Sequence, residues 1–334
     1  MKTQEMKKRP IGRIAAVAAI LAAAAAVLLL LYGWETRRQN TETPDPYAGQ
    51  EESLTYYNGA WYARRELETV LVMGVDKYAA DTETDSYVNQ EQADFLLLLV
   101  LDRNDGVCTA LPLNRDTVTE ITALGLAGER TGSFTGQLAL AHTYGSGGLD
   151  SAHNEGRAVS TLLYGTEIDH VMAFTMDAVP VLTDAVGGVP VVVEDDFSAM
   201  TDQLPMGQEV TLRGDLALTF VRGRGSMGGE KTNLNRMARQ NAYLQGLYRQ
   251  LQGAAQDEGF LTQLLLELSP YLDTDCTAAQ LNDLYQTVVQ DRLAVLDAPA
   301  GEAVVGDEFM EFHVDEDALQ QTVIELFYER RDQA

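Results

Sequence analysis

The chain has 334 residues, with 24 basic and 50 acidic side chains, a net charge of −26 and a hydrophobic content of 46%. This length fits one large domain with appendages or two small domains, and the apolar content excludes a wholly disordered chain. The acidic balance argues against a nucleic-acid partner, because phosphate binding needs a basic surface. Two cysteines, Cys108 and Cys276, exclude a disulfide scaffold and a four-cysteine zinc site. The four histidines are scattered and show no HExxH or similar metal-ligand spacing.

The N-terminal region contains nineteen uncharged residues, from Ile14 to Tyr32. A helix of about 20 apolar residues crosses a bilayer. Five basic residues and one acidic residue precede this segment, so the positive-inside rule places residues 1–13 in the cytoplasm. We therefore expect a transmembrane anchor at residues 14–33 and a single-pass cell-membrane protein whose remaining chain is extracellular. A cleaved signal peptide is the alternative, but the apolar run is longer than its usual core.

The chain beyond the predicted anchor carries 19 basic and 49 acidic residues, a net charge of −30. Residues 34–55 are polar, contain two prolines and show no apolar period, which predicts an extracellular tether. Asn58-Gly59 follows between aromatic residues and predicts a two-residue hairpin turn, because both turn positions need positive φ. Compact structure should therefore begin near residue 56.

Three apolar segments then predict strands at Glu68–Val75, Phe95–Asp102 and Val107–Leu113. The second is almost continuously apolar, which is typical of a central strand that is covered on both faces. Asn104-Asp105-Gly106 predicts the turn between the second strand and the third.

Helices and strands alternate along the rest of the chain. We expect helices at Gln137–Tyr144, Asn154–Leu163, Ala178–Val186, Gly214–Val221, Asn233–Gln252, from the capping box at Thr277 to about Gln290, and Ala318–Tyr328. Further strands are expected at Val171–Met176, Val189–Val193 and Leu293–Leu296. This alternation predicts an α/β fold with a mainly parallel or mixed sheet and helices on both faces.

A local reversal of charge marks the segment between Phe220 and Gln250, which holds six basic residues and one acidic residue. Arg222 and Arg224 lie two apart in a segment expected to be extended, so they can point the same way. On the following helix Arg236 and Arg239 are three apart and share a face, to which Gln240 also belongs. Two pairs of guanidinium groups suit a multiply charged phosphate. The alternative is a solvated helix face paired with acids elsewhere.

Polar residues that could bind a ligand stand at the ends of the predicted apolar strands. Asn114-Arg115-Asp116-Thr117 comes at the end of a strand, where open α/β sheets bind ligands, although Asp116 can equally cap a turn. Asp76 ends the first strand and Asp94 precedes the second. Each can be a simple cap, or the two carboxylates can hold Mg²⁺ together with substrate phosphates.

These features occur in an order that resembles the LytR–CpsA–Psr family of bacterial envelope proteins. The set comprises the basic tail and anchor, Met73-Gly-Val-Asp76, Ala93-Asp94-Phe95, Asn114-Arg115-Asp116-Thr117, Asp184-Ala-Val-Gly-Gly-Val, Val221-Arg-Gly-Arg224 and Arg236-x-x-Arg239-Gln240. The resemblance covers about residues 67–250. The chain is similar to Gram-positive, clostridia-like members of the family. By this resemblance, residues 56–255 would form the catalytic domain, and residues 256–334 would form a C-terminal extension packed on it.

The resemblance implies an α-β-α sandwich with a central mixed sheet that binds a polyprenyl-pyrophosphate-linked glycopolymer in an apolar tunnel. Such proteins transfer the glycopolymer to peptidoglycan as a phosphodiester, and some also hydrolyse pyrophosphate. Carried over by motif, the metal ligands for Mg²⁺ (or Mn²⁺) are Asp94 and Asp116, and Asp76 matches a further acidic position. The implied catalytic residues are Arg115, Asp116 and Arg222, and the implied diphosphate ligands are Arg115, Arg222, Arg224, Arg236, Arg239 and Gln240.

The chain departs from the family pattern at two motifs. Ala93-Asp94-Phe95 stands where the family usually has Ser-Asp-Thr, and Leu113-Asn114 where it has Ile-Pro. The Arg and Asp positions are retained, so these differences concern the shape of the tunnel mouth. Two other functions stay open: a non-catalytic polyprenyl-phosphate-binding regulator of the envelope, and a stand-alone polyprenyl-pyrophosphate hydrolase.

Overall fold

The computed structural model describes residues 54–77, 91–125, 127–223, 232–257, 259–290, 292–306 and 310–331. The predicted cytoplasmic tail, the anchor and nearly all of the tether lie outside these residues. No helix in the described part of the chain is long and apolar enough to cross a membrane. The chain divides into two compact units, Met1–Tyr56 and Tyr57–Ala334, and the elements below belong to the second, apart from the start of β1.

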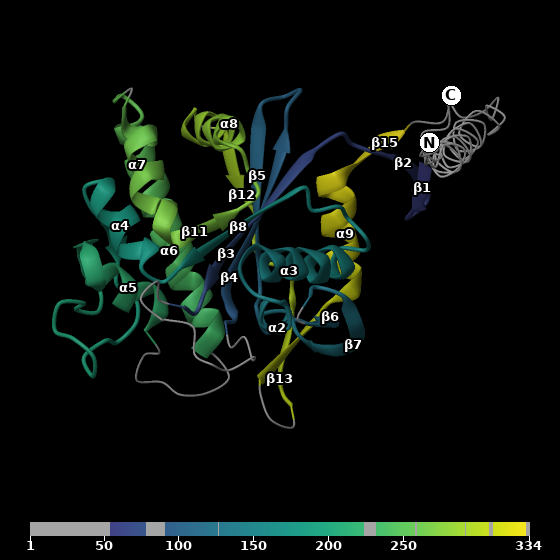
Figure 1. Cartoon of the computed structure of the whole chain (residues 1–334), viewed down its shortest axis with the longest axis horizontal. Coiled ribbons are helices and arrows are strands. Elements are labelled where there is room, and N and C mark those ends of the chain that lie inside the picture. Colours follow the sequence, from purple (N-terminus) through teal and green to yellow (C-terminus); the bar gives the residue numbers. More distant parts are fainter. Residues whose placement is uncertain are drawn as a thin grey trace, which may run out of the picture. The chain divides into compact units, whose positions relative to one another are not determined.

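A six-stranded sheet forms the centre of the second unit (Figure 1). Its strands, in spatial order, are β11 (Leu272–Thr274), β8 (His170–Thr175), β3 (Glu68–Val75), β4 (Ala93–Asp102), β5 (Val107–Leu113) and β12 (Leu293–Val295). β4 is antiparallel to both of its neighbours, whereas β3 with β8 and β5 with β12 are parallel pairs. The predicted mixed sheet is thus confirmed, with β4 as a central strand.

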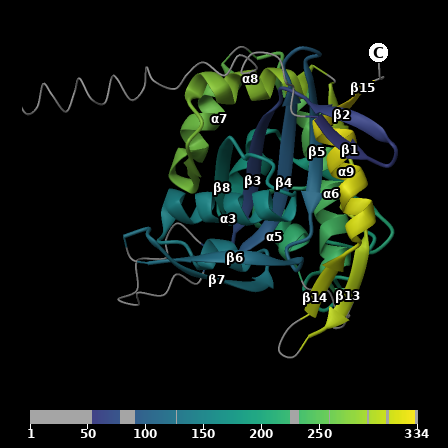
Figure 2. The same ribbon diagram turned by 90° about the vertical axis from the view of Figure 1, so that its right-hand side faces the viewer.

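Helices cover both faces of this sheet. Their bounds are α2 (Leu140–Thr143), α3 (Gly148–Leu162), α4 (Ala178–Ala185), α5 (Gly214–Arg222), α6 (Thr232–Ala254), α7 (Phe260–Leu268), the short 3₁₀ helix η1 (Ser269–Tyr271), α8 (Ala278–Val289) and α9 (Glu316–Phe327). Figure 2 shows α3 lying across the upright strands β3 and β4. The order helix, sheet, helix is the α-β-α arrangement that the sequence predicts.

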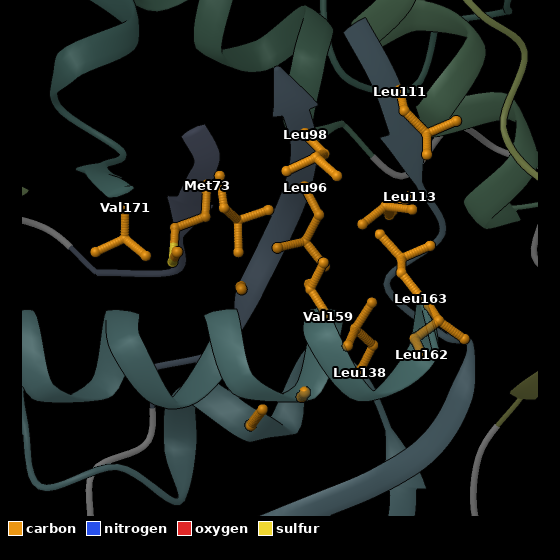
Figure 3. Packing of buried hydrophobic residues seen from close by; sticks show 14 of the residues in the cluster. Met73, Leu96, Leu98, Leu111, Leu113, Leu138, Val159, Leu162, Leu163 and Val171 are labelled. Carbon is orange, nitrogen blue, oxygen red and sulfur yellow. The ribbon is translucent and has the colours of Figure 1, made fainter. Parts of the chain in front are cut away.

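The alternation of side chains along β3 and β4 sends apolar residues into two separate cores. Leu71, Met73, Leu96 and Leu98 pack with α2, α3 and α9 on one face, where Figure 3 shows Val159 and Leu162 of α3 beneath them. On the other face, the neighbouring residues of the same strands pack toward α6 and α8. Because both faces are buried, β4 has the continuously apolar sequence from which its central position was predicted.

Three two-stranded sheets and one three-stranded sheet, β1-β2-β15, accompany the central sheet in the described part of the chain. The remaining strands are β1 (Leu54–Tyr57), β2 (Ala60–Arg64), β6 (Val118–Leu124), β7 (Arg130–Gln137), β9 (Val189–Val192), β10 (Glu209–Leu212), β13 (Gly301–Val305), β14 (Met310–Val314) and β15 (Tyr328–Arg331). β6 pairs with β7, β9 with β10, β13 with β14, and β2 with β15, all antiparallel. Asn58 and Gly59 both have positive φ, as the predicted hairpin turn requires.

Most predicted elements agree with the structure to within a few residues, and Thr277 forms the predicted capping box with Gln280. One helix prediction is wrong in part: Gln137 ends β7 rather than beginning a helix, and α2 is only four residues long. The β6–β7 and β13–β14 hairpins were not predicted. Residues after 255 supply β11 and β12, both edge strands of the central sheet.

Candidate functional site

One edge of the central sheet gathers most of the predicted site residues. β3 ends beside the start of β4, and β4 starts beside the end of β5, since Val75 pairs with Ala93 and Leu96 with Leu113. Antiparallel pairing therefore brings Asp94, at the start of one strand, next to the residues that follow the other.

Arg115 connects the two predicted metal carboxylates. Its Nη1 contacts Asp94 Oδ1, and its Nε donates to Asp116 Oδ1 at 3.0 Å. All three side chains are largely buried, with exposed fractions of 11–14%. Charged hydrogen bonds are strengthened by such partial exclusion of water, so this cluster is a preorganised set of opposite charges.

Helix α6 adds a second arginine to this cluster. Arg236 Nη1 lies 3.4 Å from Asp94 Oδ2, and its Nη2 donates to Asn233 Oδ1 at 2.7 Å. Asn233 in turn donates to Asn114 Oδ1 at 2.8 Å. The first turns of α6 are thereby fixed to the loop that follows β5, and Asp94 lies between two guanidinium groups.

Arg222, the last residue of α5, forms an ion pair with Asp76, which directly follows β3. Both side chains are exposed to about 40%, at 40% and 38%, so this pair is more accessible than the Asp94 cluster. Arg222, Asp94, Arg236 and Gln240 all line the same cavity.

That cavity has a volume of about 210 Å³ and is lined mainly by apolar side chains. They come from β3, β4, β8, α4, α5 and α6, and are Val72, Met73, Phe95, Phe174, Met176, Ala178, Val179, Leu182, Val221, Tyr243, Leu244 and Leu247. We call this space the apolar cavity and its polar residues Asp94, Arg222, Arg236 and Gln240 the mouth. An apolar space with cationic groups at its edge suits an amphiphile with an anionic head group.

A second hollow of about 200 Å³ shares Asp94, Phe95, Gln240 and Leu244 with the apolar cavity. Arg115 lines it together with residues 296–298, which follow β12. The Asp94 carboxylate is thus reached from two hollows, one of which is partly built by the C-terminal part of the chain.

Arg239 lies apart from the mouth although it is only three residues from Arg236. It forms an ion pair with Asp195, donates from Nε to the Phe220 carbonyl at 2.9 Å and from Nη2 to the Gly223 carbonyl. Its guanidinium carbon also lies 5.5 Å from the centre of the Phe197 ring. The structure therefore places Arg239 beneath the end of α5, where it holds the segment that carries Arg222.

Arg224 lies outside the described residues, so its predicted role stays a prediction. Gln137 was not among the predicted site residues, yet it donates to Asp116 Oδ1 at 3.2 Å and to the Met310 carbonyl at 2.6 Å. The Asp116 carbonyl also accepts from Phe312 N at 2.9 Å. The β13–β14 hairpin thus supports Asp116, and no local sequence pattern marks a contact over so long a separation.

A buried acid lies behind Arg115. Glu155, on α3, is fully buried and accepts a hydrogen bond from the backbone N–H of His142 at 2.8 Å. Burial raises the pKa of Glu155 well above its ordinary value, while the His142 bond and the charge of Arg115 act in the opposite direction. Burial also lowers the pKa of His142. Sequence reasoning missed Glu155, which lies on a helix with no motif around it.

The residues present fit a divalent metal by the chemistry of their donors. Asp94 and Asp116 converge on Arg115 and offer hard carboxylate oxygens, and Mg²⁺ is usually held by one or two carboxylates with substrate phosphates completing the shell. Mn²⁺ accepts the same ligands.

The fold and site define a class of protein: a three-layer α/β protein with arginines and carboxylates at the mouth of an apolar cavity. The model of the LytR_cpsA_psr family matches residues 32–327. The chain therefore belongs to the LytR–CpsA–Psr family, as its ordered motifs predict.

Curated relatives and solved structures agree with this assignment. The chain is 23% identical over 228 residues to a Bacillus cereus protein named polyisoprenyl-teichoic acid–peptidoglycan teichoic acid transferase TagU, covering 68% of this chain and 66% of that relative. TagU of Halalkalibacterium halodurans is 28% identical over 160 residues, 47% of this chain and 44% of that one. The crystal structure of B. subtilis TagV superimposes with a TM-score of 0.59 at 21% identity, covering 78% and 96% of the two chains. The structure of TagT bound to LI-WTA superimposes with a TM-score of 0.57 at 18% identity, covering 78% of this chain and 89% of that chain. These similarities establish the fold.

Proposed function

We propose that this protein is a membrane-anchored phosphotransferase that moves a glycopolymer from a polyprenyl-pyrophosphate carrier to peptidoglycan in cell-wall assembly. The observation that carries the proposal is the apolar cavity with Arg222 and Arg236 at its mouth. The names of the TagU relatives, which specify teichoic acid transfer to peptidoglycan, support it.

The polyprenyl chain would lie in the apolar cavity, where its transfer from water is favourable by about 0.8 kcal/mol for each buried CH₂ group. The diphosphate would then lie at the mouth and compete with Asp76 and Asp94 for the arginines that these carboxylates now hold. Arginine keeps its proton and can bind phosphate oxygens with two parallel hydrogen bonds, so the mouth both binds and orients the diphosphate.

In the transfer step, a hydroxyl oxygen of peptidoglycan attacks the phosphorus that carries the glycopolymer. A new P–O bond forms to the acceptor, the P–O bond to the bridging oxygen breaks, and polyprenyl phosphate leaves with that oxygen. The hydroxyl proton passes to a base, for which Asp76 is the most accessible carboxylate of the site. Charge that develops on the phosphoryl oxygens is stabilised by Arg115, Arg222 and Arg236.

A divalent cation, Mg²⁺ or Mn²⁺, would be held by Asp94 and Asp116 and would neutralise part of the diphosphate charge. Arg115 lies between these carboxylates and would position them and the phosphate together. Arg239 contributes indirectly, because it fixes the Gly223 carbonyl next to Arg222. We keep Arg224 and Gln240 as further diphosphate ligands.

We also propose that residues 14–33 anchor the chain in the cell membrane, with residues 1–13 in the cytoplasm and the remainder outside the cell. The support is the uncharged segment and the five basic residues that precede it. Such an anchor would keep the mouth within reach of a lipid carrier.

The proposal is tested with the full chain, a labelled polyprenyl-pyrophosphate glycan and peptidoglycan oligomers. Arg115→Lys and Arg222→Lys keep the charge but lose the forked geometry, so we expect each to lower transfer by about tenfold to a hundredfold. Arg249→Lys is the control, since Arg249 is an exposed residue of the same helix as Arg236. Equal and near-normal rates for all three would reject the site.

A second measurement separates transfer from hydrolysis. The reaction is run with and without peptidoglycan oligomers, and the label is followed into polymer and into free glycan phosphate. We expect label in the polymer when the acceptor is present. Release into water at the same rate with and without acceptor would favour a stand-alone hydrolase, and retention of intact carrier would favour a binding protein.

A further inference from the structure

A second group of potential metal ligands lies at the opposite end of β8 from the mouth. His170 is the first residue of this strand, whereas Thr175, its last residue, lines the apolar cavity. β8 spans six residues, so its two ends lie roughly 16 Å apart. The group is therefore distinct from the Asp94 and Asp116 carboxylates.

Three side chains of different chemistry converge here. One ligand atom each from His170, Asp275 and Cys276 lies within 4.8 Å of the other two, and no other such trio occurs in the described part of the chain. His170 Nδ1 is buried and makes no hydrogen bond, although it lies 3.4 Å from Asp275 Oδ1. A fourth residue, His153 of α3, places Nε2 3.4 Å from Asp275 Oδ2.

These distances are those of neighbouring ligands around a small cation. Zinc binds histidine nitrogen and carboxylate oxygen at about 2.0–2.2 Å, and two tetrahedral ligands at such bond lengths lie about 3.4 Å apart. The distance from His170 Nδ1 to Asp275 Oδ1 has this value, whereas His153 contacts the other oxygen of the carboxylate. The Cys276 sulfur lies within 4.8 Å of the ligand atoms of His170 and Asp275.

We infer that His170, Asp275 and Cys276 form a transition-metal site, beside which His153 contacts Asp275, and that the ion is Zn²⁺. The mixture of imidazole, carboxylate and thiolate is typical of zinc and disfavours Mg²⁺ or Ca²⁺, which take oxygen ligands. This site is independent of the proposed transfer reaction.

The neighbouring residues suit such a site. Asp275 also accepts from Val171 N at 2.9 Å, which fixes the carboxylate against β8. Gln280 Nε2 lies 2.6 Å from His170 Nε2. When Nδ1 binds metal, Nε2 carries the proton, and the Gln280 amide turned by 180° presents its oxygen to accept it. In this flipped orientation the Gln280 amide gives up its capping contact with Thr277 and supports His170 instead.

The site would join segments that are distant in sequence. His170 begins β8, Asp275 and Cys276 connect β11 to α8, and His153 of α3 contacts Asp275. A metal ion here would fasten the C-terminal strand and helix to the edge of the central sheet. Its role is therefore structural, and binding should stabilise the folded state by an amount that rises with the logarithm of the metal concentration once the site is saturated.

The test uses the full chain, reduced and freed of metal by a chelator, and titrated with Co²⁺ and then Zn²⁺. A tetrahedral Co²⁺–thiolate site gives a sulfur-to-cobalt charge-transfer band and intense visible bands, which Zn²⁺ abolishes by displacement. We expect these bands and a melting temperature that rises with Zn²⁺. Absence of the charge-transfer band would overturn the inference.

Variants identify the ligands. Cys276→Ser should remove the charge-transfer band, and His170→Gln should weaken Co²⁺ binding at least about tenfold. Cys108→Ala and His313→Gln are the matched controls, since neither residue belongs to the group, and both should keep the band. Asp94→Asn should also keep it, which separates this site from the mouth. A band that survives both Cys276→Ser and His170→Gln would contradict the assignment, and the second variant serves if the first fails to fold.

Discussion

Arg236 and Arg239 lie on the same helix, three residues apart, and have different surroundings. Arg236 faces Asp94 and the apolar cavity, whereas Arg239 is bound by Asp195 and by two backbone carbonyls. A guanidinium group whose donors are taken up by fixed backbone oxygens is part of the fold. A guanidinium paired with a carboxylate at a cavity can exchange that partner for a ligand. Spacing on a helix therefore predicts a shared face but not a shared function.

We expect substitution of Arg239 to destabilise the protein far more than substitution of Arg236. Arg239→Ala leaves Asp195 and the carbonyls of Phe220 and Gly223 without their donor, so we expect the free energy of unfolding to fall by about 3–5 kcal/mol. Arg236→Ala leaves Asp94 still paired with Arg115 and should lower it by only about 1 kcal/mol. Urea denaturation followed by circular dichroism measures both. Equal losses would remove the distinction between the two regions.

The sequence predicts the parts of the fold that depend on local apolar patterns. β3 and β5 were predicted with their observed bounds, because alternating or continuous apolar runs end at Asp76 and Asn114. The β6–β7 and β13–β14 hairpins were missed: β7 and β13 are mostly exposed and have no regular apolar alternation. β6 and β14 are mostly shielded, but each pairs only with its own hairpin partner. Their positions depend on contacts with distant segments.

The candidate site was predicted to a similar extent. Asp94, Arg115 and Arg236 stand in motifs and meet in the structure. Gln137 and Glu155 could not be found, since each contributes through contacts that only the folded chain creates. Likewise, the scattered histidines showed no metal spacing, although β8 and α3 bring His170 and His153 to one carboxylate.

The second effect concerns Asp94 and Asp116, the two predicted metal carboxylates. Asp94→Asn and Asp116→Asn keep the size of the side chain but remove its charge, so we expect each to lower transfer at least about a hundredfold and to weaken Mg²⁺ binding. The melting temperature should change little, because the amide oxygen still accepts from Arg115. Isothermal titration with Mg²⁺ and the transfer assay measure the two properties. Unchanged transfer in both variants would exclude these residues from the reaction.

The smallest effect is a pH dependence of the free energy of unfolding, which arises from the buried acid Glu155. Burial raises the pKa of Glu155, so the folded protein keeps a proton that the unfolded chain releases as pH rises. The free energy of unfolding should therefore fall with rising pH, by at most about 1.4 kcal/mol per pH unit from this group. Glu155→Gln cannot ionise and should lose less stability than the unmodified protein between about pH 5 and pH 7.

The control for this effect is Glu209→Gln, which changes an exposed acid on β10. Its stability should follow that of the unmodified protein across the same range of pH. If the stability of Glu155→Gln also follows that of the unmodified protein, Glu155 ionises normally in the folded protein and does not contribute this pH dependence.

Arg236 is proposed to bind the diphosphate, whereas Arg239 supports the fold. Calorimetric titration of a short polyprenyl pyrophosphate into the full chain, Arg236→Lys and Arg239→Lys, under conditions in which all three are folded, tests it most directly. We predict that Arg236→Lys weakens binding by about tenfold or more, because lysine cannot replace the forked contact, and that Arg239→Lys keeps the affinity. Normal affinity in Arg236→Lys together with weakened binding in folded Arg239→Lys would assign diphosphate binding to Arg239 and exclude Arg236.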